Sequence, residues 1–248
     1  MIGIVGGLGP YSGLDITKKI IDETAARSDQ EHLPLLLFSC PHLIPDRKAY
    51  LLDTSNENPG KAIASVLRKL EMAGATIAAI PSNIVHAEPI FSVVKEEIAR
   101  TGSTLQLLHI VHETVRFVNE NYPDNMVGVI STAGEQLYSL YREAFIEKGF
   151  DVVTPEGTEQ EKVNNAIYDA EYGIKAQPVP IANKAREDLL SAMDDLKKKG
   201  AQVIILGCAE LPLAIPERDY NGMIVIDPNR ILARALIHAV APDKLKPL

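Results

Sequence analysis

The sequence is poor in several features that mark whole classes of protein. It has no tryptophan and only two cysteines among 248 residues, which makes a disulfide scaffold implausible and a reducing compartment the natural setting. Lysine and arginine number 25 against 33 acidic residues, and the net charge of -8 leaves no basic stripe for nucleic acid or an anionic membrane. No apolar run reaches the roughly 18 residues of a membrane span. We therefore expect a soluble cytoplasmic protein, with no nucleic-acid or membrane partner.

The chain instead contains a regular alternation of short apolar runs and amphipathic segments. The amphipathic segments have the periodicity of helices and fill most of the gaps between the apolar runs. Such an alternation predicts an α/β fold with parallel sheets and helices on both faces of each sheet. The runs expected as strands are 2–5, 35–39, 76–80, 105–108, 126–130, 151–153, 203–206 and 223–226.

Part of this pattern occurs twice along the chain. The segment 71–83 aligns with 197–209, and the alignment pairs Ser82 with Cys208. A repeat of strand-to-loop units at a nearly constant offset indicates a duplicated domain. A second pair of segments has nearly the same offset, namely 2–9 and 127–134.

The duplication leads to a prediction of domain organisation. We expect two pseudo-symmetric Rossmann-like domains, the first made of residues 1–111 and 227–248 and the second of residues 112–226. The last helix would then return to the first domain. We expect the active site in the cleft between the two domains, because loops after paired strands would approach it from opposite sides.

Cys208 has the position of a reactive thiol. It follows the predicted strand 203–206 and Gly207, at the carboxyl edge where open α/β sheets bind ligands. A helix starting just beyond it would direct its positive end toward the sulfur, and we expect this to favour the thiolate. A lone cysteine is often only a small core hydrophobe. The prediction that Cys208 is reactive therefore depends on its place after a strand and not on the residue type alone.

Two other patterns are weaker indications of chemistry. The glycine-rich run 3–9 follows a predicted strand, but its spacing differs from the dinucleotide fingerprint and no acidic residue ends the next strand. His109 and His112 could share a helix face, but no further cysteine or histidine completes a metal site. We therefore expect neither a dinucleotide cofactor nor a metal ion at these positions.

Five motifs, spread over nearly the whole chain, resemble those of the aspartate/glutamate racemase family. That resemblance implies a cofactor-independent amino-acid racemase, commonly a homodimer, with two Rossmann-like domains. In this family two cysteines face opposite sides of the substrate α-carbon, where one removes the α-proton as a thiolate and the other returns a proton as a thiol. The motifs are Gly6-Gly-Leu-Gly-Pro10, Ile44-Pro-Asp-Arg47, Pro81-Ser-Asn-x-x-His86, Ser131-Thr-Ala-Gly134 and Leu206-Gly-Cys-Ala-Glu210.

The resemblance assigns roles to individual positions. Cys208 matches the second catalytic cysteine, and Ser82 stands where the family has the first. Glu210 and His86 would orient these two groups, although a structural role is equally compatible with their positions. The expected substrate-binding residues are Arg47, Asp46, Asn83, Ile84, Ser131, Thr132 and Lys175.

Departures from the family pattern leave the function open at this stage. A serine hydroxyl is a much poorer base than a thiol, so the two-thiol mechanism cannot operate unaltered. The chain could be an asymmetric racemase of aspartate- or glutamate-like amino acids with one cysteine, or an engineered cysteine-to-serine form. It could instead be a catalytically silent carboxylate-binding homologue, or a one-thiol isomerase or lyase of another small carboxylic acid. The departures are Ser82, Ile84, Ala209 and Glu135.

Overall fold

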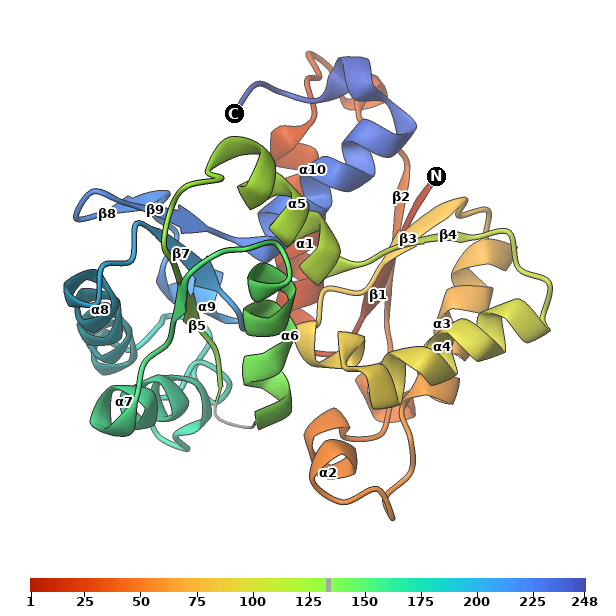
Figure 1. Ribbon diagram of the computed structural model, residues 1–248. Helices are drawn as coiled ribbons and strands as arrows, with labels where there is room; N and C mark the ends of the chain where they lie inside the picture. The colour runs from red at the N-terminus through yellow and green to blue at the C-terminus, as the bar shows by residue number, and fades with distance from the viewer. Residues whose placement is uncertain (133–134) are drawn as a thin grey trace. The chain divides into compact units, whose positions relative to one another are not determined.

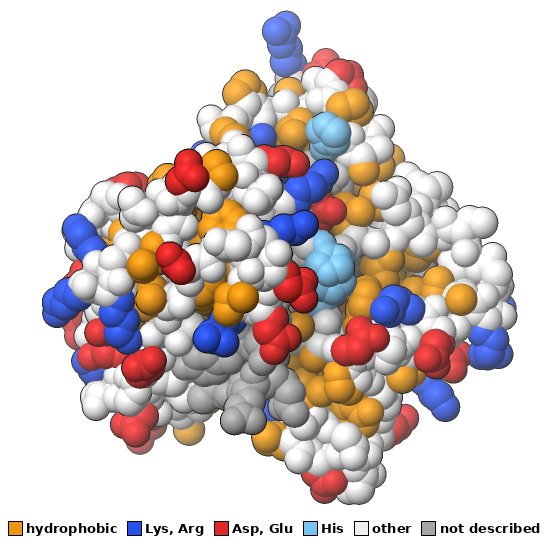
Figure 2. All heavy atoms as spheres, viewed as in Figure 1, with side chains coloured by type: hydrophobic (Ala, Val, Ile, Leu, Met, Phe, Trp, Pro, Cys, Tyr) orange, Lys and Arg blue, Asp and Glu red, His pale blue; other side chains and the backbone are white. Residues whose placement is uncertain are grey.

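The computed structural model describes residues 1–132 and 135–248, without the side chains of residues 135–139 (Figure 1). The chain divides into two compact units. Unit 1 comprises Met1–Glu113 and Asn229–Leu248, and unit 2 comprises Thr114–Pro228. In the described part of the chain, no helix combines the length and the apolar character needed to cross a membrane. On the face drawn in Figure 2, acidic and basic side chains are interspersed.

Unit 1 contains a parallel sheet with the strand order β2-β1-β3-β4. The strands are β1 (Ile2–Gly6), β2 (Leu35–Ser39), β3 (Ile77–Ala79) and β4 (Gln106–Leu108). Helices α3 and α4 pack side by side (Figure 1). The helices of this unit are α1 (Pro10–Glu23), α2 (Arg47–Leu52), α3 (Gly60–Met72), α4 (Glu88–Arg100) and α10 (Pro228–Val240), while α5 (Ile110–Asn121) passes into unit 2.

Unit 2 contains a second sheet with the strand order β6-β5-β7-β9-β8. Its strands are β5 (Val127–Ile130), β6 (Val152–Val153), β7 (Val203–Leu206), β8 (Asp219–Tyr220) and β9 (Met223–Ile226). Among the strands that the structure describes, β8 alone is antiparallel to its neighbour. Helices α7 and α8 pack together and bury Val163, Leu189 and Met193. The helices are α6 (Glu135–Ile146), α7 (Gly157–Tyr168), α8 (Asn183–Lys198) and α9 (Leu211–Ala214).

The two sheets repeat one plan in detail. The sheet order β2-β1-β3-β4 corresponds to β6-β5-β7-β9. In both units the second residue of the first strand in the chain is a glycine with a tightly packed neighbour. A Cβ placed on Gly3 would lie 3.0 Å from the Cβ of Ala75, and one placed on Gly128 would lie 3.0 Å from the Cβ of Ala201. Larger side chains at these positions would overpack the contact. The same glycine is therefore required in each unit for the same steric reason.

Helix α10 packs on α1 within unit 1. Glu23, near the end of α1, forms ion pairs with Arg230 and Arg234 of α10. Residues of the C-terminal segment thus complete the unit that begins at the N-terminus.

Candidate active site

Ser82 lies in a tight turn where β3 ends. Its amide donates a hydrogen bond to the carbonyl of Ile80, at 2.8 Å, and its carbonyl accepts one from the amide of Val85, at 3.3 Å. A short 3-10 helix, Asn83–His86, follows. Ser82 is only 3% exposed, and no hydrogen bond to its hydroxyl is found among the described residues. The hydroxyl is therefore held in a buried turn at the carboxyl edge of the sheet.

Cys208 occupies the same kind of turn in unit 2. Its carbonyl accepts a hydrogen bond from the amide of Leu211, at 3.1 Å, three residues further on as at Ser82. The preceding Gly207 lets the chain pass close to β5, since a Cβ there would lie 2.9 Å from the carbonyl oxygen of Ile130. The two backbones thus share the i+3 hydrogen bond at the positions that the repeat pairs, while the three-residue turn closes one residue earlier in unit 2, from the amide of Gly207 to the carbonyl of Ile205, at 3.0 Å.

The thiol of Cys208 is linked to a carboxylate and an ammonium group. Its Sγ donates a hydrogen bond to Oε2 of Glu210, at 3.0 Å, and the other carboxylate oxygen forms an ion pair with Nζ of Lys175. Burial, and then the negative charge of Glu210, raise the pKa of the Cys208 thiol well above its usual value, against the opposing effect of Lys175. The resting thiol is protonated at neutral pH.

The expectation of a depressed thiol pKa is therefore wrong. It relied on a helix dipole, but α9 has only four residues, Leu211–Ala214, and the dipole of so short a helix is small because few peptide units contribute to it. The loss of hydration and an adjacent carboxylate both disfavour a thiolate. These two effects outweigh Lys175.

Tyr168 joins this cluster although the sequence analysis assigned it no role. The Nζ of Lys175 lies 5.8 Å from the centroid of the Tyr168 ring, and the phenol forms a hydrogen bond with the side chain of Thr132. Burial, followed by the charge of Cys208, raises the pKa of the Tyr168 phenol. Unit 2 thus gathers the predicted residues Cys208, Glu210, Lys175 and Thr132 around one aromatic ring.

Ser131 and Thr132 directly follow β5 and are buried. The Nε2 of Gln160 donates a hydrogen bond to the carbonyl of Ser131, at 3.0 Å. The Ser131 hydroxyl is buried and has no hydrogen-bond partner within the described part of the chain. The rest of this motif, and the side chain of Glu135, lie outside the described residues.

Arg47 and Asp46 lie at the start of α2, which packs against the 3-10 helix that follows Ser82. The carboxylate of Asp46 accepts a hydrogen bond from the amide of Ala49, at 2.9 Å, and so caps α2. The Nη2 of Arg47 donates to the carbonyl of Leu8, at 2.9 Å. Arg47 is thus the first residue of a short helix. The observed bonds give Asp46 a structural role and leave its predicted contact with substrate a proposal.

His86 lies on the same 3-10 helix as Asn83 and the half-buried Ile84. Its Nδ1 donates to the carbonyl of Ser82, at 3.0 Å, and its Nε2 is buried without a hydrogen-bond partner among the described residues. Burial lowers the pKa of His86 to about 4, with the carbonyl of Ser82 opposing this effect. His86 is therefore neutral and supports the backbone of Ser82.

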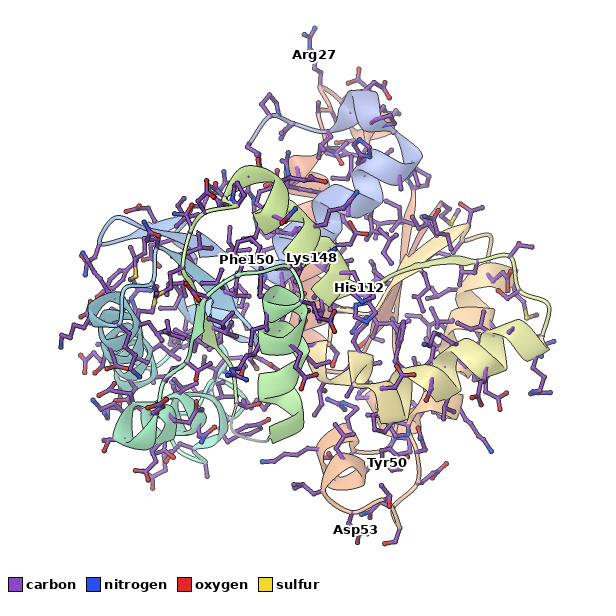
Figure 3. The ribbon with its side chains drawn as sticks, viewed as in Figure 1. Arg27, Tyr50, Asp53, His112, Lys148 and Phe150 are labelled. Carbon is purple, nitrogen blue, oxygen red and sulfur yellow. The ribbon has the colours of Figure 1, made fainter. Side chains whose placement is uncertain are left out.

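A short stack of rings extends from His86 toward the start of α5. The ring centroid of His109 lies 4.4 Å from that of His86 and 3.8 Å from that of His112, and His112 is labelled in Figure 3. Burial, followed by the charges of the neighbouring histidines, lowers the pKa of His109 to about 2. Across the described residues, no group of three or more histidine, cysteine or acidic side chains could hold a metal ion.

These features can be compared with known proteins. A sequence profile described as Asp/Glu/hydantoin racemase matches residues 5–236. The chain belongs to the Asp/Glu/hydantoin racemase family. The resemblance inferred from the five motifs is thereby confirmed, and so is the assignment to the amino-acid racemases, a class of isomerases.

Individual racemases align over almost the full length of the chain. It is 26% identical over 242 residues to the broad specificity amino-acid racemase RacX of Bacillus subtilis, with 96% of both proteins covered. The aspartate racemase of Picrophilus torridus is 25% identical, with a TM-score of 0.77 over 96% of this chain and 93% of the other. An aspartate racemase homologue from Pyrococcus horikoshii is 24% identical, with a TM-score of 0.71 over 96% and 97% of the two chains, and shows the fold alone. The predicted α/β fold of this racemase family is confirmed.

Proposed function

We propose that this protein racemises a small amino acid related to aspartate or glutamate, without a cofactor and with one proton-transfer group on each unit. Cys208 would serve one face of the α-carbon and Ser82 the other. The observation that carries the proposal is the matched pair of turns, in which Ser82 and Cys208 accept the same i+3 amide hydrogen bond. Inverting a stereocentre by proton transfer needs an acid/base group on each face.

Cys208 would remove the α-proton of the L-isomer. Its thiol is protonated in the free protein, so substrate binding has to promote its ionisation. The α-ammonium group of a bound amino acid would bring a positive charge close to the sulfur, and an opposite charge favours the ionised form. The Cα–H bond then breaks, the proton goes to sulfur, and the electron pair is delocalised into the substrate carboxylate.

Ser82 would complete inversion by donating its hydroxyl proton to the opposite face of the carbanion. The hydroxyl regains a proton from water, and Cys208 keeps the α-proton and so returns to the thiol of the free protein. The proton that the thiol released to water when it ionised balances the one that Ser82 takes up. Serine is a weak acid and a weak base in comparison with cysteine. We therefore expect slower turnover than a two-thiol site would give.

Substrate binding is assigned to the side chains around the two turns. Arg47 can bind a carboxylate bidentately, and Asn83 and Thr132 can donate hydrogen bonds to the α-carboxylate. Ile84 and Ser131 would contact the substrate beside these donors. Lys175, which forms an ion pair with Glu210, would adjust the charge around the thiol rather than bind substrate alone.

A second function is favoured by one observation. Because Cys208 is held as a thiol beside Glu210, it could act only as an acid, as in a one-thiol isomerase or lyase acting on another small carboxylic acid. Such an enzyme would deuterate one face of its substrate and would form no enantiomer.

The deciding experiment is proton NMR of α-hydrogen exchange in D2O with L- and D-aspartate, L- and D-glutamate and a panel of other amino acids. We expect loss of the α-proton signal with at least one pair of enantiomers, and loss of this activity in Cys208→Ala. The two directions must have equal kcat/KM, because enantiomers have equal free energies in water. Exchange without inversion would favour the second function. No exchange, with saturable binding of a carboxylate, would indicate a silent homologue.

The composition and the family resemblance also lead us to propose a cytoplasmic homodimer. Sedimentation equilibrium would test the dimer, and a mass equal to one 27.1 kDa chain would contradict it.

A further inference from the structure

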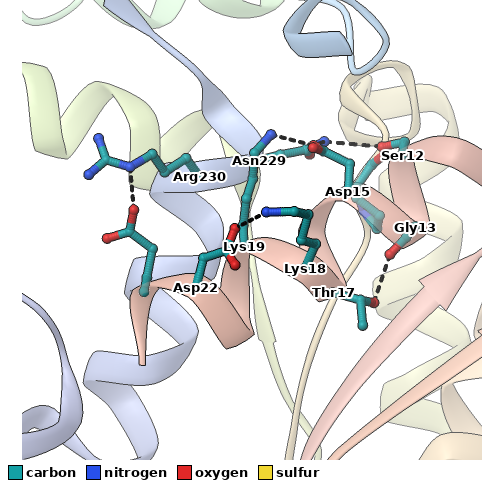
Figure 4. Close-up of polar contacts among 11 residues, drawn as sticks. Ser12, Gly13, Asp15, Thr17, Lys18, Lys19, Asp22, Asn229 and Arg230 are labelled. Carbon is teal, nitrogen blue, oxygen red and sulfur yellow. Dashed lines mark hydrogen bonds and ion pairs between the residues drawn. The ribbon is translucent and has the colours of Figure 1, made fainter. Parts of the chain in front are cut away.

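A buried polar chain in unit 1 ends at the peptide that precedes Ser82. The hydroxyl of Ser12, in the first turn of α1, donates to the carbonyl oxygen of Pro81, at 2.7 Å. The amide Nδ2 of Asn229, near the start of α10, donates to the oxygen of Ser12, at 3.2 Å, and to Oδ2 of Asp15, at 3.0 Å. Figure 4 shows how these bonds connect α1 with α10. The start of α1, the start of α10 and the peptide that precedes Ser82, which are far apart in the sequence, are therefore joined by hydrogen bonds.

The directions of these hydrogen bonds are fixed by chemistry. A carboxylate only accepts, so the group of Asn229 that faces Asp15 must be its NH2, and the same nitrogen reaches Ser12. The Pro81 carbonyl likewise only accepts, so the Ser12 hydroxyl must donate to it. Asp15 is itself held by an ion pair with Lys19. Ser12 and Asn229 are both buried, where a lost partner would leave a polar group unsatisfied.

The carbonyls of Pro81 and Ser82 both accept hydrogen bonds from side chains. Pro81 has no amide hydrogen, and the adjacent hydrogen bond from Ser82 to Ile80 closes a three-residue turn, which directs the Pro81 carbonyl outward. Ser12 binds that carbonyl, and His86 binds the next one, that of Ser82. Two consecutive carbonyls are thus held by buried side chains on either side of the Ser82 α-carbon.

We infer that Ser12, supported by Asn229, is a positioning residue that fixes the Ser82 hydroxyl for proton transfer. The inference rests on the proposed role of Ser82. A displacement of about 1 Å at a reacting group can cost roughly 10²-fold in rate, and a weak acid such as serine depends strongly on its geometry. Asn229 is also the first residue of the segment that returns to unit 1. The point where the chain re-enters this unit is therefore hydrogen-bonded to the turn that presents Ser82.

The first test needs no catalytic activity. In a Cys40→Ser, Cys208→Ser background, the thiol of Ser82→Cys is alkylated with iodoacetamide. Adding Ser12→Ala should loosen the turn and speed alkylation about tenfold, equivalent to about 1.4 kcal/mol of easier opening. Ser12→Thr should restore the slow rate, because it keeps the hydroxyl. An unchanged rate in Ser12→Ala would overturn the inference.

Thr17→Ala is the matched control. Thr17 lies about one turn further along α1, and its hydroxyl donates to the carbonyl of Gly13, at 2.7 Å (Figure 4). The Thr17→Ala substitution also removes a hydrogen bond from a hydroxyl on α1 to a backbone carbonyl. If Thr17→Ala speeds alkylation as much as Ser12→Ala does, the effect comes from general loosening of α1 and the positioning role is rejected.

The second test measures the role in turnover. An L-amino acid that exchanges in D2O yields deuterated L-isomer by return to the same face and deuterated D-isomer by inversion. The ratio of these products does not depend on the amount of folded enzyme, so a general loss of stability leaves it unchanged. Ser12→Ala should lower inversion relative to retention about tenfold, in line with the expected opening. An unaltered ratio would contradict positioning, whereas a wild-type protein with no exchange at all would count against the proposed function alone.

Discussion

At the scale of single residues, the protonation of Cys208 depends on two charged side chains with opposite effects. Glu210 accepts the thiol hydrogen bond and raises the thiol pKa, while Lys175 lowers it. Both act on top of burial, which is the largest contribution. The reactivity of this thiol can therefore be changed in either direction without altering the cysteine.

We predict that Glu210→Gln lowers the thiol pKa, because it removes a negative charge and keeps a similar shape. Lys175→Met should raise the pKa by removing the compensating positive charge. Iodoacetamide labelling of Cys208 against pH, in a Cys40→Ser background, measures both. The labelling curve should move to lower pH in the first variant and to higher pH in the second. Shifts of both curves in the same direction would show that packing, and not charge, determines the pKa of the Cys208 thiol.

The sequence identified most of the residues that meet around Cys208 but not their electrostatics. Glu210 is two residues away, and the family resemblance already placed Lys175 in the site. The direction of the thiol pKa could not be predicted, because it depends on burial and on the ion pair between those two residues. Tyr168 was missed because a tyrosine at the end of a helix carries no signal of its contacts.

At the scale of secondary structure, α2 links a capping residue to a candidate binding residue. Asp46 caps the six-residue helix that starts with Arg47. Loss of an N-cap typically costs about 1 kcal/mol, and so short a helix depends strongly on its cap. The position of Arg47 is therefore tied to Asp46 whether or not Asp46 contacts substrate.

We predict that Asp46→Ala lowers the free energy of unfolding by about 1 kcal/mol and raises KM, because α2 frays at Arg47. Asp46→Ser keeps a capping oxygen and should restore both stability and KM. Chemical denaturation and steady-state kinetics provide the two values. If Asp46→Ser recovers stability but not KM, the carboxylate itself binds the substrate.

The long, periodic elements were predictable and the short ones were not. The central strands β1, β3, β5 and β7 were predicted within one or two residues of their observed bounds, since buried parallel strands are continuous apolar runs. Helix α2 and the two-residue strand β8 were missed. Neither is long enough to show a hydrophobic period, and both are fixed by tertiary contacts.

At the scale of the whole molecule, unit 1 is assembled from both ends of the chain. Glu23 on α1 forms ion pairs with Arg230 and Arg234 on α10. Burial opposes ionisation of Glu23, but the hydrogen bonds and charges of the two arginines outweigh it and lower the Glu23 pKa. A lowered folded-state pKa stabilises the protein at neutral pH, and this contribution is lost as the pH falls through that pKa.

We predict that Glu23→Gln destabilises the protein by about 3 kcal/mol at pH 7, because two largely buried arginines lose their counter-charge. The difference from the wild type should begin to shrink as the pH falls below the usual carboxyl pKa, and it should be lost only below the lowered pKa of folded Glu23, where the folded wild type also loses the charge. Thermal unfolding over a pH series from neutral into the acidic range below that lowered pKa measures this. A difference that does not depend on pH would assign the loss to packing.

The repeat makes the central claim testable in the whole protein. If Ser82 is the counterpart of Cys208, then Ser82→Cys supplies a second thiol at nearly the same volume, in a turn with the same i+3 hydrogen bond. A positioned acid/base group typically contributes roughly 10² to 10⁴ in rate. The gain should disappear in the double variant Ser82→Cys, Cys208→Ala, because both faces must be served.

The measurement is the racemisation rate of aspartate and glutamate, followed by polarimetry from both enantiomers, for the wild type, Ser82→Cys and the double variant. The matched turns predict an increase of roughly 10² to 10⁴ in Ser82→Cys, with equal kcat/KM in the two directions. A folded Ser82→Cys variant that racemises neither amino acid faster than the wild type would contradict the assignment of Ser82 and Cys208 as the paired proton-transfer groups.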